Sequence, residues 1–224
     1  MKKPVIAIDG YSSTGKSSIS KVIAEKLGLI HLDTGALYRG VTWFALQNCL
    51  NEDDSINLDQ LFSSFNEIEL EFKNDNGELV LFLNHIDISK AIRNNEVSDN
   101  VSFVAKQKEV RDFLLQSQRN LAEKGGIIMD GRDIGTVVLP NADYKFFLTA
   151  SIDERTKRRY NELISLKIEA DEQQVKENLI IRDKIDSERE IAPLKQAEDA
   201  IVIDNTSLTK QETIDSILSH IQKI

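Results

Sequence analysis

The sequence predicts an α/β fold, a five-stranded parallel sheet with helices on both of its faces. Short apolar runs alternate along the chain with amphipathic stretches, which is the pattern of parallel strands connected by helices. A glycine-rich loop follows the first apolar run and opens the first amphipathic stretch, as at a tight strand-to-helix junction. The 224 residues suit one domain with small insertions, and we expect residues 1–224 to form a single domain.

The five expected strands are short apolar runs, because parallel strands are buried on both faces. They comprise residues 5–8, 29–32, 126–129, 144–148 and 200–203. Apolar residues at helical spacing predict amphipathic helices over residues 19–27, 110–121 and 214–221. Thr209 and Glu212 form a capping-box pattern, which predicts the start of the last of these helices.

One segment interrupts the alternation. Residues 68–72 and 79–83 have the composition of strands, and Asn76-Gly77 between them is a strong hairpin-turn signal. A β-rich insert at about residues 61–95 is therefore predicted. The polar residues 51–55 predict a surface loop, which lacks the glycine and terminal glutamate of a calcium loop.

Composition and charge exclude several classes of protein. Lys and Arg number 28 against 37 Asp and Glu, a net charge of −9, which argues against a nucleic acid partner because phosphate backbones are bound by basic residues. The lone Cys49 excludes a disulfide scaffold and any cysteine-based zinc site. No run approaches about 18 apolar residues, and the apolar run after Lys2 and Lys3 is too short for a signal peptide, so we expect a cytoplasmic protein without a membrane span.

Residues 10–17 fit the pattern G-x-x-x-x-G-K-[ST] at every fixed position, and they lie between an expected strand and an expected helix. Glycines allow successive backbone N–H groups and the helix N-terminus to point at phosphate oxygens. We expect Lys16 to reach the β- and γ-phosphates of a nucleoside triphosphate and the Ser17 hydroxyl to ligate Mg²⁺. The expected ATP-binding residues are Gly10, Tyr11, Ser12, Ser13, Thr14, Gly15, Lys16, Ser17 and Ser18.

Other kinds of P-loop or nucleotide-binding protein fit less well. A GTPase would carry an Asn-Lys-x-Asp motif, which this chain lacks, and the glycine spacing is not that of a dinucleotide-binding protein. There is also little room for motor or AAA-type machinery. A small-molecule kinase remains.

Polar groups follow the second and third expected strands, at the sheet edge where ligands bind in such folds. Residues 33–39 supply Thr34 and Arg39, and residues 130–133 supply Asp130, Arg132 and Asp133. Asp130 ends a strand and is expected to hold Mg²⁺ through water. Two helical arginine clusters follow, and guanidinium groups bind phosphate bidentately. The members of each cluster share one helix face: Arg155, Arg158 and Arg159 in the first, and Arg182, Asp186 and Arg189 in the second. The helix of the second cluster must end before Pro193.

Over nearly its whole length the chain resembles the bacterial cytidylate kinase family. The segments that carry the resemblance, besides the P-loop, are Asp33-Thr-Gly-Ala-Leu-Tyr-Arg39, Asp130-Gly-Arg-Asp133, Arg182-x-x-x-Asp186-x-x-Arg189 and Ala192-Pro193-Leu194. The resemblance implies an adenylate-kinase-like core in residues 1–60, 96–151 and 171–224. It also implies that the insert at 61–95 binds a nucleoside monophosphate, and that residues 152–170 form a short lid carrying three arginines.

The resemblance further implies the roles of individual residues. The cytosine would be read by Ser102, Arg111 and Asp133, and the ribose held by Arg182 and Asp186. The acceptor phosphate would be bound by Arg39, Arg132 and Arg189. Thr34 stands where the family often has serine, which keeps the hydroxyl in the CMP site. The catalytic residues implied are Lys16, Arg132, Arg155, Arg158 and Arg159.

The activity implied is phosphorylation of CMP and dCMP by ATP, with Mg²⁺, in a monomeric enzyme. Two alternatives stay open: another small-molecule kinase, which would lack the pairing of Asp133 with Arg111, and a nucleotide-dependent switch without an acceptor. Outside these motifs, His31 lies in an expected strand and is interpreted as a packed core residue. His85 and His220 are expected to have no partners of metal-ligand type nearby.

Overall fold

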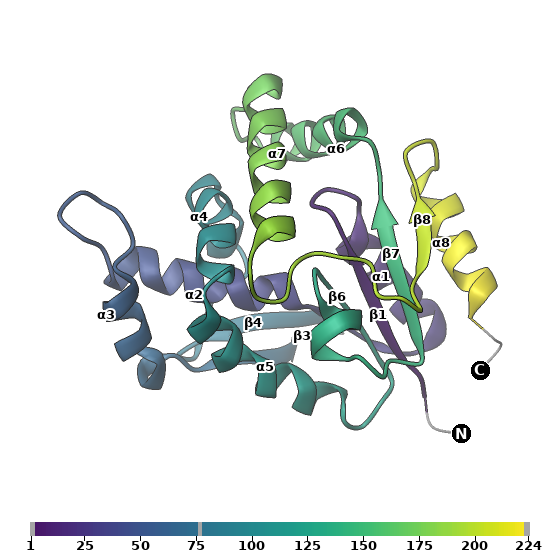
Figure 1. Ribbon diagram of the computed structural model, residues 1–224, viewed down its shortest axis with the longest axis horizontal. Helices are drawn as coiled ribbons and strands as arrows, with labels where there is room; N and C mark the ends of the chain where they lie inside the picture. Colours follow the sequence, from purple (N-terminus) through teal and green to yellow (C-terminus); the bar gives the residue numbers. More distant parts are fainter. Residues whose placement is uncertain (1–2, 76–77, 222–224) are drawn as a thin grey trace. The chain divides into compact units, whose positions relative to one another are not determined.

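The computed structural model describes residues 3–75 and 78–221, which fold into two compact units (Figure 1). Unit 1 comprises residues 1–32 and 119–224, and unit 2 comprises residues 33–118. The predicted turn residues Asn76-Gly77 lie outside the described residues.

Unit 1 is built on a five-stranded sheet with the strand order β2-β6-β1-β7-β8. The strands are β1 (Val5–Gly10), β2 (Ile30–Asp33), β6 (Ile127–Gly131), β7 (Tyr144–Thr149) and β8 (Ile201–Asp204). Strand β1 pairs in parallel with β6 and β7, and β7 pairs in parallel with β8. The predicted α/β fold with a parallel sheet is confirmed, with each strand within one or two residues of its expected position.

Four helices and one short turn complete unit 1. They are α1 (Lys16–Leu27), α6 (Ile152–Ser165), α7 (Glu172–Glu188), α8 (Lys210–His220) and a π-helical turn at Ile134–Val138. Helices α1 and α8 pack on the sheet through an apolar cluster that includes Ile19, Ile23, Ile128, Phe146 and Ile217. The predicted capping box of α8 is present, since Thr209 and Glu212 each accept the other's backbone N–H.

The end of β1 requires glycine. Gly10 has a φ of 146°, and a Cβ there would lie 2.0 Å from the carbonyl oxygen of Leu148 on the neighbouring strand β7. Any side chain would therefore push β1 away from β7 at the point where the phosphate loop leaves the sheet. Gly28 ends α1 in the left-handed conformation with a φ of 62°, and its N–H returns to carbonyls of the last turn.

Unit 2 combines helices with a small sheet. Its elements are α2 (Thr34–Asn48), α3 (Leu58–Ser63), α4 (Asn95–Ala105), most of α5 (Lys108–Ala122), and strands β3 (Leu70–Asp75), β4 (Glu78–Leu83) and β5 (Ile86–Asp87), with short 3₁₀ turns at Phe65–Glu67 and Ala91–Arg93. Strands β3 and β4 form an antiparallel pair in which Leu70 faces Leu83, and β5 extends the sheet. The expected hairpin strands are confirmed, and residues 51–55 form the expected loop.

The small sheet packs closely on α2 inside unit 2. A Cβ at Gly40, in the middle of α2, would lie 2.9 Å from Leu70 Cδ2, so glycine allows this close approach. Val41, Ala45, Leu81, Ile88 and Ile92 belong to the core that joins α2 to β4 and the segment after it. The boundaries 61–95 for an insert and 152–170 for a lid stay a prediction. Among the described residues, no helix has the length and apolar character needed to cross a membrane.

Candidate active site

The phosphate loop of unit 1 connects β1 to α1, as the sequence predicts. Two of its residues have positive φ, Ser13 at 60° and Gly15 at 89°, and Gly15 is the N-cap of α1. No side chain caps this helix N-terminus. The N-cap residue therefore leaves the first backbone N–H groups uncapped, which is the arrangement that binds phosphate at helix N-termini in strand–loop–helix motifs.

Lys16 is buried at the start of α1, and its ammonium group bends back over the loop. Its Nζ donates a hydrogen bond to the Tyr11 carbonyl oxygen at 2.6 Å. Burial lowers the pKa of Lys16 well below its ordinary value, and the nearby positive charge of Arg132 lowers it further. A polyphosphate beside Lys16 would oppose both effects, because an anion favours the charged amine.

Asp130, the fourth residue of β6, binds two side chains from different elements. The Ser17 hydroxyl of α1 donates to Asp130 Oδ2 at 2.6 Å, and His31 Nε2 of β2 lies 2.6 Å from Asp130 Oδ1. The interpretation of His31 as a packed core residue was wrong. His31 lies on the strand next to β6 and is within hydrogen-bond distance of a carboxylate that is 3% exposed. This contact exists because β2 and β6 are neighbours in the sheet. The apolar residues around His31 in the sequence do not predict a carboxylate partner.

The pairing of Ser17 with Asp130 brings a hydroxyl and a carboxylate together beside the phosphate loop. Both groups offer oxygen, the ligand atom that Mg²⁺ prefers, and Mg²⁺ bound to substrate phosphates uses one or two carboxylates with several waters. The donor set therefore fits Mg²⁺. Asp9 is a further buried carboxylate in β1, and its oxygens accept the backbone N–H groups of Ile134 and Gly135 at 2.8 and 2.7 Å.

Burial and hydrogen bonding shift the pKa of the Asp9 carboxyl in opposite directions. Burial raises its pKa from 3.8 to about 7, while the N–H groups of Gly135 and Ile134 act in the opposite direction. The two hydrogen bonds connect Asp9 of β1 to the turn at Ile134–Val138. This turn directly follows residues 130–133, which include three of the candidate site residues. Asp9 belongs to none of the motifs recognised in the sequence, although its position at the end of the first strand is a signal that could have found it.

Arg132, Asp133, Asp186 and Arg189 form one charged network in unit 1. Arg132 donates to Asp186 Oδ2 at 2.9 Å and to the Ser12 hydroxyl of the phosphate loop at 2.6 Å. Arg189 lies 3.5 Å from Asp133 Oδ1 and 4.0 Å from Asp186 Oδ1. Burial raises the pKa of Asp186, but Arg132, Arg189 and Arg182 outweigh it, and the net pKa is below the ordinary value.

Arg155 and Arg158, two arginines of the predicted lid, contact the phosphate loop. Arg155 is 6% exposed, lies over the Tyr11 ring and donates to the Ser12 carbonyl at 3.4 Å, while Asp183 pairs with its guanidinium at 2.6 Å. Arg158 donates to the Thr14 carbonyl at 3.5 Å. Arg159 pairs with Glu162 at 2.9 Å on an exposed part of α6.

Asn205 is a site residue that sequence reasoning missed. It is buried directly after β8, donates to the Thr14 carbonyl at 2.9 Å and accepts a hydrogen bond from Arg158 at 3.0 Å. Asn205 thus connects the phosphate loop to α6. Its position after the carboxyl end of an expected strand is the one signal that could have found it.

Unit 2 carries four of the predicted CMP-binding residues: Thr34, Arg39, Ser102 and Arg111. Asp33 caps α2 and also accepts a hydrogen bond from Arg39 at 2.6 Å. The Arg39 Nε is buried and has no hydrogen-bond partner in the part of the chain that the structure describes. Arg111 stacks on the Tyr38 ring with its guanidinium carbon 5.4 Å from the ring centre and donates to the Ala105 carbonyl.

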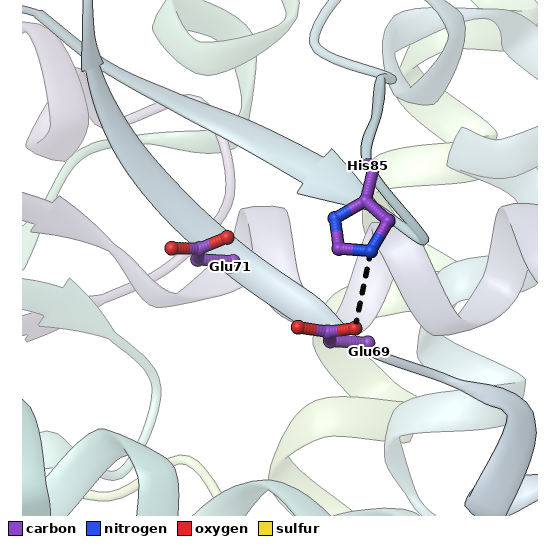
Figure 2. Close-up of side chains that lie close together, drawn as sticks. All are labelled: Glu69, Glu71 and His85. Carbon is purple, nitrogen blue, oxygen red and sulfur yellow. Dashed lines mark ion pairs between the residues drawn. The ribbon is translucent and has the colours of Figure 1, made fainter.

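His85 also differs from its prediction. Glu69, Glu71 and His85 each offer a ligand atom, and these atoms lie within 4.8 Å of one another on the surface of unit 2 (Figure 2). His85 Nε2 lies 3.7 Å from Glu69, so partners of metal-ligand type are nearby after all. Glu71, however, pairs with Lys73 at 3.2 Å, and all three cluster residues are exposed. The register of β3 with β4 brings the three side chains together. Because His85 is distant from Glu69 and Glu71 in the sequence, the sequence alone did not predict this proximity.

The parallel sheet, the phosphate loop and the basic residues around it define a P-loop kinase as the class of protein. A family model described as cytidylate kinase matches residues 6–223. The chain is 47% identical over 222 residues to the cytidylate kinase of Bacillus subtilis strain 168, covering 99% of this chain and 98% of that protein. It is 45% identical over 224 residues to the cytidylate kinase of Streptococcus pneumoniae strain 70585, covering 100% and 99%.

The chain belongs to the cytidylate kinase family, and it is a nucleoside monophosphate kinase that phosphorylates CMP and dCMP with ATP. A crystal structure of an uncharacterized protein from Eubacterium ventriosum shares the fold with a TM-score of 0.52 at 13% sequence identity, covering 98% of each chain.

Proposed function

We propose that unit 1 binds the phosphoryl donor as ATP with Mg²⁺. Residues Gly10 to Ser18 surround the triphosphate, Lys16 contacts its β- and γ-phosphates, Ser17 ligates the metal ion and Asp130 holds it through water. The support is the direct contact of Ser17 with Asp130 at 2.6 Å and the uncapped N-terminus of α1 beside it. When bound, Mg²⁺ neutralises negative charge on the phosphate oxygens.

CMP is the acceptor, and we propose which residues bind it. In unit 2 these are Thr34, Arg39, Ser102 and Arg111, and in unit 1 they are Arg132, Asp133, Arg182, Asp186 and Arg189. The buried Nε of Arg39 supports its role, because a buried guanidinium N–H without an acceptor is costly and a phosphate oxygen would satisfy it. Asp186 supports the arginines of unit 1 by keeping their side chains in one network.

The transfer needs no covalent intermediate and no strong base, because the acceptor is already a phosphate oxygen anion. An oxygen of the CMP phosphate attacks the γ-phosphorus of ATP, and the bond from the γ-phosphorus to the bridging oxygen of ADP breaks. Arg39, Arg132 and Arg189 would align the attacking phosphate. Lys16, Arg155, Arg158 and Arg159 would neutralise the migrating group together with Arg132. Catalysis would then be positioning plus charge stabilisation.

The observation that carries this proposal is that Lys16, Arg132, Arg155 and Arg158 all donate to atoms of residues 11–14. A coupled assay of ADP release with and without CMP tests it. We expect rapid release with CMP and little without it, since water must be excluded from the γ-phosphate. ADP release that does not depend on CMP would contradict the assignment of the acceptor. All of the proposed residues come from one chain, so we also propose that the monomer is active, which sedimentation during turnover can test.

A further inference from the structure

We infer that His31 is a positioning residue for the metal-binding carboxylate: its Nε2–H holds Asp130 Oδ1 so that Asp130 keeps its orientation when Mg²⁺ and nucleotide bind. The inference deepens the proposed function and rests on its assignment of Asp130. Asp130 uses its two oxygens separately, Oδ2 for the Ser17 hydroxyl and Oδ1 for His31. A carboxylate oxygen only accepts hydrogen bonds, so the ring nitrogen that faces it is the one that carries the proton.

The backbone holds both partners of this contact. His31 lies in β2 and Asp130 in β6, which are neighbours in the sheet, and the N–H of Ile30 binds the carbonyl of Gly126 at 2.8 Å. Asp130 itself faces Ile8 in the register of β6 with β1. A side chain that spans two neighbouring strands restricts the rotation of Asp130 more than a flexible partner on a loop would.

The contact also has a favourable local environment. The side chain of Asp130 is 3% exposed and that of His31 is 17% exposed, so water competes little for the hydrogen bond. A hydrogen bond to an ionised group is stronger than a neutral one, and low polarity around it adds strength. If Ser17 turns from Asp130 to the metal ion, His31 remains to fix the other oxygen. Partners that orient metal ligands contribute about 10-fold to 100-fold to metal affinity, and we expect His31 to contribute on the lower part of this scale because Asp130 holds the ion through water.

The test compares the binding of ADP with and without metal, by titration calorimetry of the full chain. His31→Phe keeps the ring volume and removes the donor, and we expect it to weaken binding of ADP in Mg²⁺ by at least about 10-fold. Binding of ADP in EDTA should be unchanged. His31→Gln retains an N–H donor and should recover most of the metal-dependent binding. His220→Phe, at the exposed end of α8, is the matched control.

The outcomes separate this inference from the proposed function. Equal weakening of ADP binding in Mg²⁺ and in EDTA, or none in either, would overturn the role of His31. Should His31→Phe fail to fold, His31→Leu and the recovery in His31→Gln decide the same question. Asp130→Asn and Ser17→Ala test the metal site itself. If neither of them reduces the Mg²⁺-dependent part of ADP binding, the assignment of the metal ligands fails, whatever His31 does.

Discussion

The surroundings of Lys16 suit this side chain for binding phosphate. It is buried, its amine is held by the Tyr11 carbonyl, and its pKa is lowered by burial and by Arg132. Burial thus disfavours the charged form of the amine, and a phosphate beside it would offset that effect. Its contribution to the apolar core is small, so its removal should affect chemistry more than folding.

We expect Lys16→Ala to lower kcat for CMP phosphorylation by at least about 10³-fold, the scale for removing one preorganised charge. The melting temperature should stay close to that of the wild type. Lys26→Ala, on the exposed face of the same helix, is the matched control and should retain full activity. A folded Lys16→Ala enzyme with near-normal turnover would refute the role of the phosphate loop.

Base choice should depend on Asp133. Cytosine has an exocyclic amino group where uracil has a carbonyl. A carboxylate accepts a hydrogen bond from the amino group and repels the carbonyl oxygen. We expect Asp133→Ala to lower kcat/KM for CMP. The corresponding activation free energy should rise by about 1–3 kcal/mol, the cost of an unpaired buried polar group. The ratio of kcat/KM for CMP to that for UMP should fall at least ~10-fold.

Asp133 has a second role that the same experiment can separate. Its carboxylate lies 3.5 Å from Arg189, which is proposed to bind the acceptor phosphate. A disturbed Arg189 would weaken CMP and UMP equally, because both carry the same phosphate. An unchanged CMP-to-UMP ratio would therefore mean that Asp133 positions Arg189 and does not read the base.

Asp9 should make the stability of the protein depend on pH in a specific direction. Burial raises its pKa to about 7, so between about pH 4 and pH 7 the folded state holds a proton that the unfolded state has lost. The free energy of unfolding attributable to Asp9 therefore falls as pH rises through this window. Asp9→Asn cannot titrate there, so the stability of the wild type relative to Asp9→Asn should fall between pH 4 and pH 7.

Urea unfolding of both proteins at several pH values measures this difference. Asp59→Asn changes an exposed carboxylate and serves as the control. A relative stability that rises with pH would show that the N–H groups of Ile134 and Gly135 dominate over burial. In that case Asp9 would act as a permanently ionised anchor of the turn after β6.

At the scale of elements, α6 and α7 are joined by a small set of contacts. Ser151 and Asp171 cap their N-termini, and a small apolar cluster of Leu163, Val175 and Leu179 joins them. Asp183 of α7 pairs with Arg155 of α6. A cluster this small allows local opening at a low free energy, whereas charged contacts with the phosphate loop can close the helices on a nucleotide.

We expect amide hydrogen exchange in residues 152–170 to slow when ATP analogue and CMP are both bound, because donor and acceptor must be enclosed before transfer. Exchange should also slow in 61–75 and 78–95, the described part of the predicted insert. Helix α8 is the internal control and should keep its exchange rates. Unchanged protection in all of these segments would contradict closure of the lid and the insert.

At the scale of the whole molecule, a net charge of −9 coexists with a local cluster of arginines at the candidate site. Arginines at the site are neutralised by nearby carboxylates such as Asp183 and Asp186, and the rest of the surface carries the acidic excess. A small phosphorylated ligand can be bound by such a local cluster. The balance of charge thus favours nucleotides over a nucleic acid.

A panel of acceptors tests the specificity of the molecule as a whole. We expect kcat/KM for CMP and dCMP to exceed that for UMP by at least about 10-fold, since a site built for the cytosine amino group leaves polar groups unpaired with uracil. AMP and GMP should be poorer still, because their larger bases must fit the same pocket. Faster ADP release with an acceptor other than these pyrimidine nucleotides would indicate a different kinase specificity.

The sequence by itself determined the elements and the phosphate loop of this protein. The phosphate loop, the five strands, the capping box at Thr209 and the antiparallel hairpin all depend on short-range pattern, because strand and helix periodicity and turn residues act within a few positions. The motifs at 33–39, 130–133 and 182–189 also pointed to the family by their residues alone.

Only the tertiary structure decided which side chains meet. The contact of His31 with Asp130 spans 99 residues, that of Arg189 with Asp133 spans 56, and that of Asn205 with the Thr14 carbonyl spans 191. The first of these contacts follows from the strand order β2-β6-β1-β7-β8, in which β2 and β6 are neighbours although they are distant in the chain. The other two join segments that follow strands or helices far apart in the sequence. Strand pairing is a long-range choice made by packing, so a histidine in an apolar run could be placed beside a carboxylate only once the sheet was known.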